Sequence, residues 1–224
     1  MCENARPMRI GILGATGPAG AGLAARLSSV GHEVLFGSRA VDKAKSAVEE
    51  LQLKWGERAS GLIPCDNAWA CDAPVVILAV NADSAIPTVK EHSERLANKV
   101  VVSMANNLTR NGNEFNAVLP PHGSVAAEIQ AFLWRSRVVT AFHLVPAAEF
   151  ADLDHTMESD VVVLGDDDEA RETLMEITGS IPNLRALDGG SLRNAVGMET
   201  FAAVLLTINV RHKMKASLRL QTVR

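Results

Sequence analysis

Short, largely apolar runs alternate with amphipathic segments along most of the chain. The runs at 8–13, 73–80 and 99–104 consist mainly of Val, Ile, Leu and Ala, which is typical of strands buried on both faces of a parallel sheet. Between the runs, the segments 18–30 and 40–54 carry their apolar residues at helical spacing. This alternation of strands and helices predicts an α/β fold.

The same pattern continues to the end of the chain. We expect further strands at 33–37, 61–64, 137–142, 160–164 and 184–187. We expect further helices at 83–96, 124–134, 167–178 and 192–215, a long loop at 105–121 and a connecting segment at 143–154. The order predicts a doubly wound, Rossmann-type, mainly parallel sheet at 8–187. Residues 188–224 would form a small C-terminal helical part that caps the sheet or packs on a second subunit.

A glycine-rich turn, GATGPAG at 14–20, follows the first predicted strand and opens the first helix. Glycine at such a turn permits a positive φ and lets main-chain N–H groups approach an anion. The positive end of the helix dipole faces the same anion. The spacing G-x-x-G-x-x-G would place Thr16 and Gly17 closest to a pyrophosphate. Taken alone, the glycine pattern is equally compatible with a plain tight turn.

The end of the second predicted strand indicates which dinucleotide would bind. NAD-binding folds place an acidic residue here to accept hydrogen bonds from the ribose hydroxyls, but this chain has Ser38 and Arg39. A hydroxyl and a planar guanidinium both suit a 2′-phosphate, and Lys43 lies one helical turn further on. The alternative is an ordinary basic start to a surface helix. Because the glycine turn lies upstream, we favour an NADP site.

Ligands of open α/β sheets bind beyond the carboxyl ends of the strands, which here places 80–82, 103–107 and 141–147 at the site. Their side chains are mostly small, apolar or amide groups. We find no catalytic triad and expect no metal, so the site is suited to holding planar rings, as hydride transfer requires. His143 is the exception, although a lone histidine at a strand end is more often structural.

Composition and charge limit the partners and the compartment. The chain has 224 residues and a net charge of −4, which argues against a nucleic-acid surface. It has no apolar run of about 18 residues that could span a membrane, and 1–7 do not resemble a signal peptide. Cys2, Cys65 and Cys71 lack zinc-site spacing and are interpreted as free thiols of a cytoplasmic protein. The acidic run 166–168 is interpreted as a helix start rather than a metal site.

Several motifs, taken together, resemble one family. They are GATGPAG at 14–20, GHEV at 31–34, GSR at 37–39, AAEI at 126–129, VVTAFHLVPAA at 138–148 with Phe150, GDDDE at 165–169 and LDGG at 187–190. From Met8 onward, the chain resembles the NADPH-dependent reductases of coenzyme F420, an 8-hydroxy-5-deazaflavin. The resemblance implies a homodimer that transfers a hydride reversibly between NADPH and F420, with F420 as co-substrate.

The resemblance also implies roles for individual residues. The turn, with Gly14, Thr16, Gly17, Pro18, Ala19 and Gly20, would hold the pyrophosphate of NADP. Ser38, Arg39 and Lys43 would hold the 2′-phosphate. Val80, Asn106 and Ala147 would lie against the ribose and nicotinamide. His143 and Val145 would border the face where the two rings meet and are our candidate catalytic residues.

The chain departs from the family pattern at 195–199 and at 209–219, where family members carry additional Arg, Tyr and Gly residues. This end of the chain helps to form the deazaflavin pocket in the family. Two alternatives therefore stay open. One is an NADP-dependent flavin, ferric or imine reductase of the same Rossmann type. The other is a non-catalytic NADP(H)-binding sensor.

Overall fold

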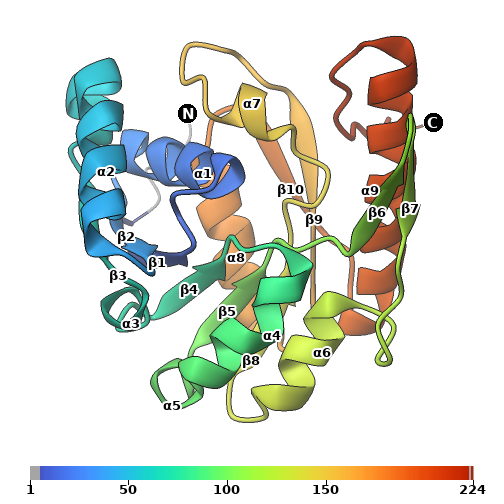
Figure 1. Cartoon of the computed structure of the whole chain (residues 1–224), viewed down its shortest axis with the longest axis horizontal. Coiled ribbons are helices and arrows are strands. Elements are labelled where there is room, and N and C mark those ends of the chain that lie inside the picture. Colours follow the sequence, from blue (N-terminus) through green and yellow to red (C-terminus); the bar gives the residue numbers. More distant parts are fainter. Residues whose placement is uncertain (1–5, 222, 224) are drawn as a thin grey trace.

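An eight-stranded sheet forms the centre of the computed structural model, which describes residues 6–221 and 223 (Figure 1). Its strand order is β10-β9-β8-β5-β4-β1-β2-β3. Neighbouring strands are parallel except for the pair β8 and β9, which is antiparallel. The predicted doubly wound, mainly parallel sheet is confirmed. The strands are β1 (Arg9–Leu13), β2 (Glu33–Ser38), β3 (Leu62–Asp66), β4 (Val75–Leu78), β5 (Val100–Ser103), β8 (Arg137–Thr140), β9 (Ser159–Gly165) and β10 (Leu184–Asp188).

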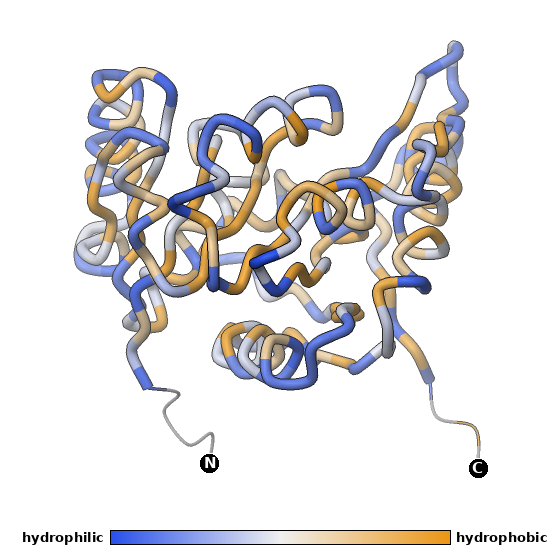
Figure 2. The backbone as a smooth tube through the Cα atoms, turned by 90° about the horizontal axis from the view of Figure 1, so that it is seen from below, coloured by the Kyte–Doolittle hydropathy of each residue, from blue (hydrophilic) through white to orange (hydrophobic). Residues whose placement is uncertain are grey.

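Helices cover both faces of the sheet because the central strands are apolar on both faces. On β4, Val75 and Ile77 join the core beneath one layer of helices, while Val76 and Leu78 join the core beneath the other. Figure 2 shows hydrophilic and hydrophobic stretches alternating along the outer helices. The first layer consists of α1 (Pro18–Ser29), α2 (Val41–Trp55) and α8 (Asp168–Ser180), and the second of α3 (Asn67–Ala70), α4 (Ala82–Glu91), α5 (Ser93–Leu96) and α6 (Val125–Phe132).

The sequence predictions need correction at the helix 83–96, at the loop 105–121 and at the connecting segment 143–154, which contains the short helix α7 (Ala147–Phe150). The expected helix at 83–96 is interrupted at His92 and forms α4 and α5. The expected loop at 105–121 contains an antiparallel hairpin of β6 (Leu108–Asn111) and β7 (Glu114–Ala117). Its strands are only four residues long. β6 is polar after its first residue, and the polar–apolar alternation of β7 is too short to identify a strand on its own. The hairpin lies beside α9 (Ala195–His212), where the N–H of Phe115 donates to Oγ1 of Thr207 at 2.9 Å (Figure 1).

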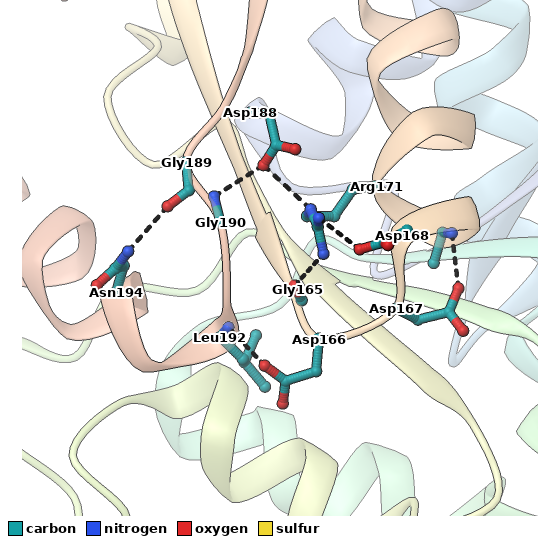
Figure 3. Close-up of polar contacts among 11 residues, drawn as sticks. Gly165, Asp166, Asp167, Asp168, Arg171, Asp188, Gly189, Gly190, Leu192 and Asn194 are labelled. Atoms are coloured by element: carbon teal, nitrogen blue, oxygen red, sulfur yellow. Dashed lines mark hydrogen bonds and ion pairs between the residues drawn. The ribbon is translucent and has the colours of Figure 1, made fainter.

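The acidic run opens α8, as predicted (Figure 3). Asp167 caps the helix by accepting the N–H of Ala170 at 2.8 Å. Asp166 accepts the N–H of Leu192 at 2.9 Å, at the start of a short 3-10 helix (Leu192–Asn194). Asp168 pairs with Arg171 at 2.7 Å. Each carboxylate therefore has a structural partner within the chain.

No helix in the described residues is long and apolar enough to cross a membrane. Cys65 and Cys71 are buried free thiols. Cys2, the third cysteine of our prediction, lies outside the described residues, as does most of 1–7.

A buried carboxylate joins the last helix to the sheet domain. Glu199 of α9 is 5% exposed and accepts the N–H groups of Val125 and Ala126 at 2.8 and 3.1 Å. These are the first two residues of α6, whose end is also capped by the hydroxyl of Ser124. Burial raises the pKa of Glu199 to about 7, against the opposing effect of the two N–H donors.

Glu199 should make the stability of the protein pH-dependent. Its pKa is about 7 in the folded protein against 4.5 for the free group, so the folded state binds the proton more tightly than the unfolded state. The free energy of unfolding contributed by this group should therefore fall by roughly 3 kcal/mol as the pH rises through that window. Urea unfolding at pH 5 and pH 8 should show this loss in the wild type and not in Glu199→Gln. Equal pH dependence in the two proteins would contradict the assignment.

Candidate functional site

The glycine turn lies at the carboxyl edge of the sheet, between β1 and α1. Gly14 has φ +75°, and a Cβ there would lie 2.6 Å from Cγ1 of Val80. A Cβ on Gly20 would lie 2.9 Å from Cα of Ala15. Glycine is therefore required at both positions, because the turn packs directly against the end of β4 and against the first turn of α1.

Main-chain hydrogen bonds and one side chain fix the shape of this turn. The N–H of Gly14 donates to Oδ1 of Asn67 at 3.3 Å, and the N–H of Ala15 donates to the carbonyl of Gly37 at 2.9 Å. Asn67 begins α3, directly after β3. Sequence analysis ended this strand at residue 64, two residues before its observed end at Asp66, and so did not identify Asn67 as a strand-end residue.

The beginning of α1 presents N–H donors to the cleft. Gly17 is the N-cap, forms no side-chain capping bond and is followed by Pro18, which has no N–H to satisfy. Among the described residues, the N–H groups of Thr16, Ala19 and Gly20 form no hydrogen bond. An anion at this point would meet both these donors and the positive end of the helix dipole.

A cleft of about 520 Å³ opens beside this helix start. Its size is that of a typical small-molecule site, and none of its lining residues is acidic. The structure brings together six predicted residues here: Gly14, Thr16, Ser38, Arg39, Lys43 and Val80. Asn81, from the predicted stretch 80–82, also lines the cleft. Sequence analysis did not assign to the nucleotide the other lining residues, which are Ala40, Asn67, Ala79, Ser84 and Thr88.

The end of β2 gives this cleft a positive charge. Ser38 is buried, and its Oγ accepts the N–H of Ala40 at 3.3 Å, which leaves the hydroxyl proton available to a ligand. Arg39 and Lys43 are exposed. Over the described part of the chain, neither forms an ion pair. Two unpaired cations and a hydroxyl donor therefore border one end of the cleft.

His143 lies after β8 in a buried polar cluster and is 9% exposed. Its Nε2 lies 2.6 Å from Oγ1 of Thr140, and its Nδ1 lies 2.8 Å from Oδ1 of Asn106. The Asn106 amide in turn donates from Nδ2 to the carbonyl of His143 at 3.0 Å. The structure thus joins two predicted site residues, Asn106 and His143, by two hydrogen bonds.

These bonds assign the proton on the ring. Because Nδ2 of Asn106 donates to a carbonyl, Oδ1 must be the atom that faces the imidazole, so Nδ1 carries the proton. Nε2 lies 2.6 Å from the hydroxyl of Thr140, which also donates to the carbonyl of Ser103 at 2.9 Å. Burial lowers the pKa of His143 to about 4, so the ring is neutral at pH 7. Both nitrogens are bonded within the chain, which makes the ring a fixed support rather than a proton donor.

The backbone beside His143 is strained. Phe142 has φ +65°, an uncommon conformation for a bulky residue that is held only where its surroundings enforce it. Val145 and Ala147 follow and are half-buried, and Ala147 begins α7 (Ala147–Phe150). His143 and Val145 also border a small cavity of about 10 Å³ with Asp160 on β9 and Met198 on α9.

The divergent C-terminal segment is packed against this region. Asp160 donates its N–H to the carbonyl of Leu218 at 2.8 Å and accepts the N–H of Leu220 at 2.6 Å. The side chain of Leu218 packs in an apolar cluster with Leu144 and Leu205. The C-terminal segment therefore packs beside the residues that follow β8.

Sequence comparisons agree with this architecture. A family model described as "NADP oxidoreductase coenzyme F420-dependent" matches residues 9–107. A protein of Methanocaldococcus jannaschii named "F420-dependent NADP reductase" is 35% identical over 215 residues, covering 94% of this chain and 96% of that protein. The chain belongs to the F420-dependent NADP reductase family. The resemblance noted from its motifs is thereby confirmed.

One further relative and one solved structure extend the comparison. The F420-dependent NADP reductase of Methanothermobacter marburgensis is 30% identical, over 93% of this chain and 95% of that protein. The crystal structure of a putative F420-dependent NADP reductase from Arthrobacter sp. FB24 has a TM-score of 0.81 at 23% identity. It covers 96% of this chain and 100% of that chain, so the fold is shared over its full length.

Proposed function

We propose that the cleft at the start of α1 and the segment after β8 together form the NADP–F420 site. As a member of the family, the chain is an oxidoreductase that transfers a hydride reversibly between NADPH and F420. The observation that carries the site assignment is the cleft itself. None of the residues that line it is acidic. The free N–H groups at the start of α1 border it at one point, and the cations of Arg39 and Lys43 border it at another.

The predicted NADP contacts fit this geometry. The N–H groups of Thr16, Ala19 and Gly20 would bind the pyrophosphate, with Gly17 and Pro18 forming the start of the helix. Ser38 would donate its hydroxyl proton to the 2′-phosphate. Arg39 and Lys43 would neutralise the charge of this phosphate, which an acidic residue at the same place would repel.

The ring end of the site has a positioning role. Val80, Asn106 and Ala147 would lie against the ribose and nicotinamide, and His143 and Val145 would border the meeting face of the two rings. NADPH supplies the hydride when bound. The chain contributes a rigid apolar surface, braced by the bonds of Asn106 to a neutral His143, that excludes water and holds donor and acceptor in contact. No proton transfer by His143 is required.

An exposed apolar stripe on α9 supports the proposed homodimer. Phe201, Val204 and Ile208 lie on one face of the helix and are 38%, 50% and 36% exposed, while Ala202 and Ala203 are buried on the opposite side. Apolar side chains at i, i+3 and i+7 on a solvent-facing surface suit helix packing against a second copy. We retain 8–187 as the NADP-binding domain and 188–224 as the dimerisation part. The β6–β7 hairpin, from within 8–187, packs on α9.

The thiols and the net charge bear on the compartment and the partners of the protein. Buried free thiols at Cys65 and Cys71 suit a reducing cytoplasm. A net charge of −4 and an acid-free cleft suit small anionic ligands rather than nucleic acid.

The cofactor assignment and the reaction can be tested together. The wild type should bleach oxidised F420 with NADPH, and more slowly with NADH. Arg39→Ala should weaken the binding of NADPH by roughly 10- to 150-fold, the effect of one lost charged contact. The binding of NADH should stay nearly unchanged. Lys45→Ala is a matched control, because Lys45 lies on α2, just after Arg39, but outside the cleft, and pairs with Asp42. Equal losses with the two cofactors would refute the role of Arg39. NADPH binding without bleaching of F420 would refute the reaction.

The dimer proposal predicts a mass change. Light scattering should give the wild type twice the chain mass of 23.9 kDa. Val204→Glu should give a single chain mass, because burying an unpaired carboxylate in an apolar interface is costly. Leu53→Glu, at an apolar residue of α2 that is 88% exposed, should leave the dimer intact. A monomeric wild type, or a dimeric Val204→Glu, would contradict the proposed interface.

A further inference from the structure

A buried arginine joins the pyrophosphate helix to the segment that follows the ring-facing residues. Arg26, in the third turn of α1, is 6% exposed. Its Nε donates to the carbonyl of Phe150 at 2.7 Å. One Nη donates to the carbonyls of Glu149 at 2.9 Å, Asp152 at 2.6 Å and His155 at 3.3 Å. The guanidinium also lies over the ring of Phe150, 5.3 Å from its centroid.

The helix backbone approaches the same segment closely. A Cβ on Gly22, one turn before Arg26, would lie 2.9 Å from the main-chain N of Ala151. Two contacts on one face of α1 therefore set the distance to α7. The first is the backbone at Gly22, which has no side chain, and the second is the set of hydrogen bonds from the Arg26 guanidinium.

The chain from α7 back to the site is short and constrained. Ala147 begins α7, whose first turn closes through the N–H of Phe150 on the carbonyl of Pro146 at 2.9 Å. Val145 and His143 precede it directly. The rings of Phe150 and Phe142 lie 6.1 Å apart, so the strained residue before His143 also packs on the residue that Arg26 holds.

The chemistry of the contact requires arginine. The residues from 151 to 158 form no helix or strand. Besides Arg26, the carbonyl of Asp152 accepts the N–H of His155 at 3.2 Å in a turn, and that of His155 has no main-chain partner among the described residues. A guanidinium offers five N–H donors in a planar fork, whereas an ammonium is a compact point charge on a flexible stem. Lysine could replace some of these hydrogen bonds but not all of them.

We propose that Arg26 is a positioning residue for hydride transfer. It fixes the segment 143–147, through α7, at a set distance from the helix that would bind the pyrophosphate. This inference rests on the proposed function of the site. Arg26 touches no reacting atom. It acts through α7 on the surface against which the nicotinamide would lie.

Two independent variants test the proposal. Arg26→Lys should lower kcat for F420 reduction by on the order of 10- to 100-fold, the effect of a small misplacement of reacting groups. The Kd for NADPH should change less than about 2-fold, because the phosphate contacts stay in place. Gly22→Ala should likewise lower kcat with little change in the Kd for NADPH, because its Cβ displaces α7 from α1. This second variant tests the proposal if Arg26→Lys fails to fold.

Matched controls separate positioning from stability. Arg58→Gln removes contacts to Leu153 and Asp154, further along the same segment, and should keep the wild-type kcat. Gly179→Ala adds a methyl to a helix at a site with no atom within 4 Å and should also be neutral. A wild-type kcat in Arg26→Lys and Gly22→Ala, or an equal loss in the controls, overturns the proposal.

Amide hydrogen exchange distinguishes this inference from the proposed function. In Arg26→Lys, the amides of 147–155 should exchange at least about 10-fold faster than in the wild type, whatever the second substrate is. Unchanged exchange overturns the proposal even if F420 is reduced. If the wild type transfers no hydride to F420, the proposed function fails, and with it the catalytic part of this inference.

Discussion

The site depends on how closely three pieces of backbone meet at the carboxyl edge of the sheet. Because Gly14 and Gly20 carry no side chain, the end of β1, the start of α1 and the end of β4 pack against one another without a gap. This packing leaves the N–H groups of Thr16, Ala19 and Gly20 without a hydrogen-bond partner among the described residues. The proposed anion site would thus arise from backbone geometry, and the cations of Arg39 and Lys43 would then determine which anion is favoured.

The ring end follows a different physical principle. His143 is held by Thr140 and Asn106, and burial keeps it neutral, so the role we propose for it depends on rigidity. A strained residue before it and a pinned helix after it restrict the same short segment. Arg26 joins this segment to the phosphate end of the site. A single helix, α1, would thereby set the position of both halves of the nicotinamide nucleotide.

Much of this architecture is readable from the sequence, and the failures have specific causes. Continuous apolar runs predicted the strands of the sheet, since strands buried on both faces permit little else. The glycine turn and Ser38-Arg39 predicted one end of the cleft, because local backbone chemistry determines it. The β6–β7 hairpin was missed because its short polar strands are stabilised by α9, about 90 residues away in the sequence.

The long-range polar contacts were equally invisible. Asn67 holds Gly14 across 53 residues, and Arg26 meets its carbonyl partners across more than 120. No local pattern signals a side chain that bonds to main-chain carbonyls, because any residue can supply a carbonyl. F420 was predicted as the second substrate from the family resemblance, and not from residue spacing or periodicity.

Isotope transfer tests the central claim most directly. NADPH deuterated at the transferred position of the nicotinamide would be mixed with oxidised F420 and the enzyme in ordinary water, and the reduced deazaflavin analysed by mass spectrometry. Direct transfer between two stacked rings predicts one deuterium retained in the product. Reduced deazaflavin that carries only solvent hydrogen, with the label lost to water, would contradict the account.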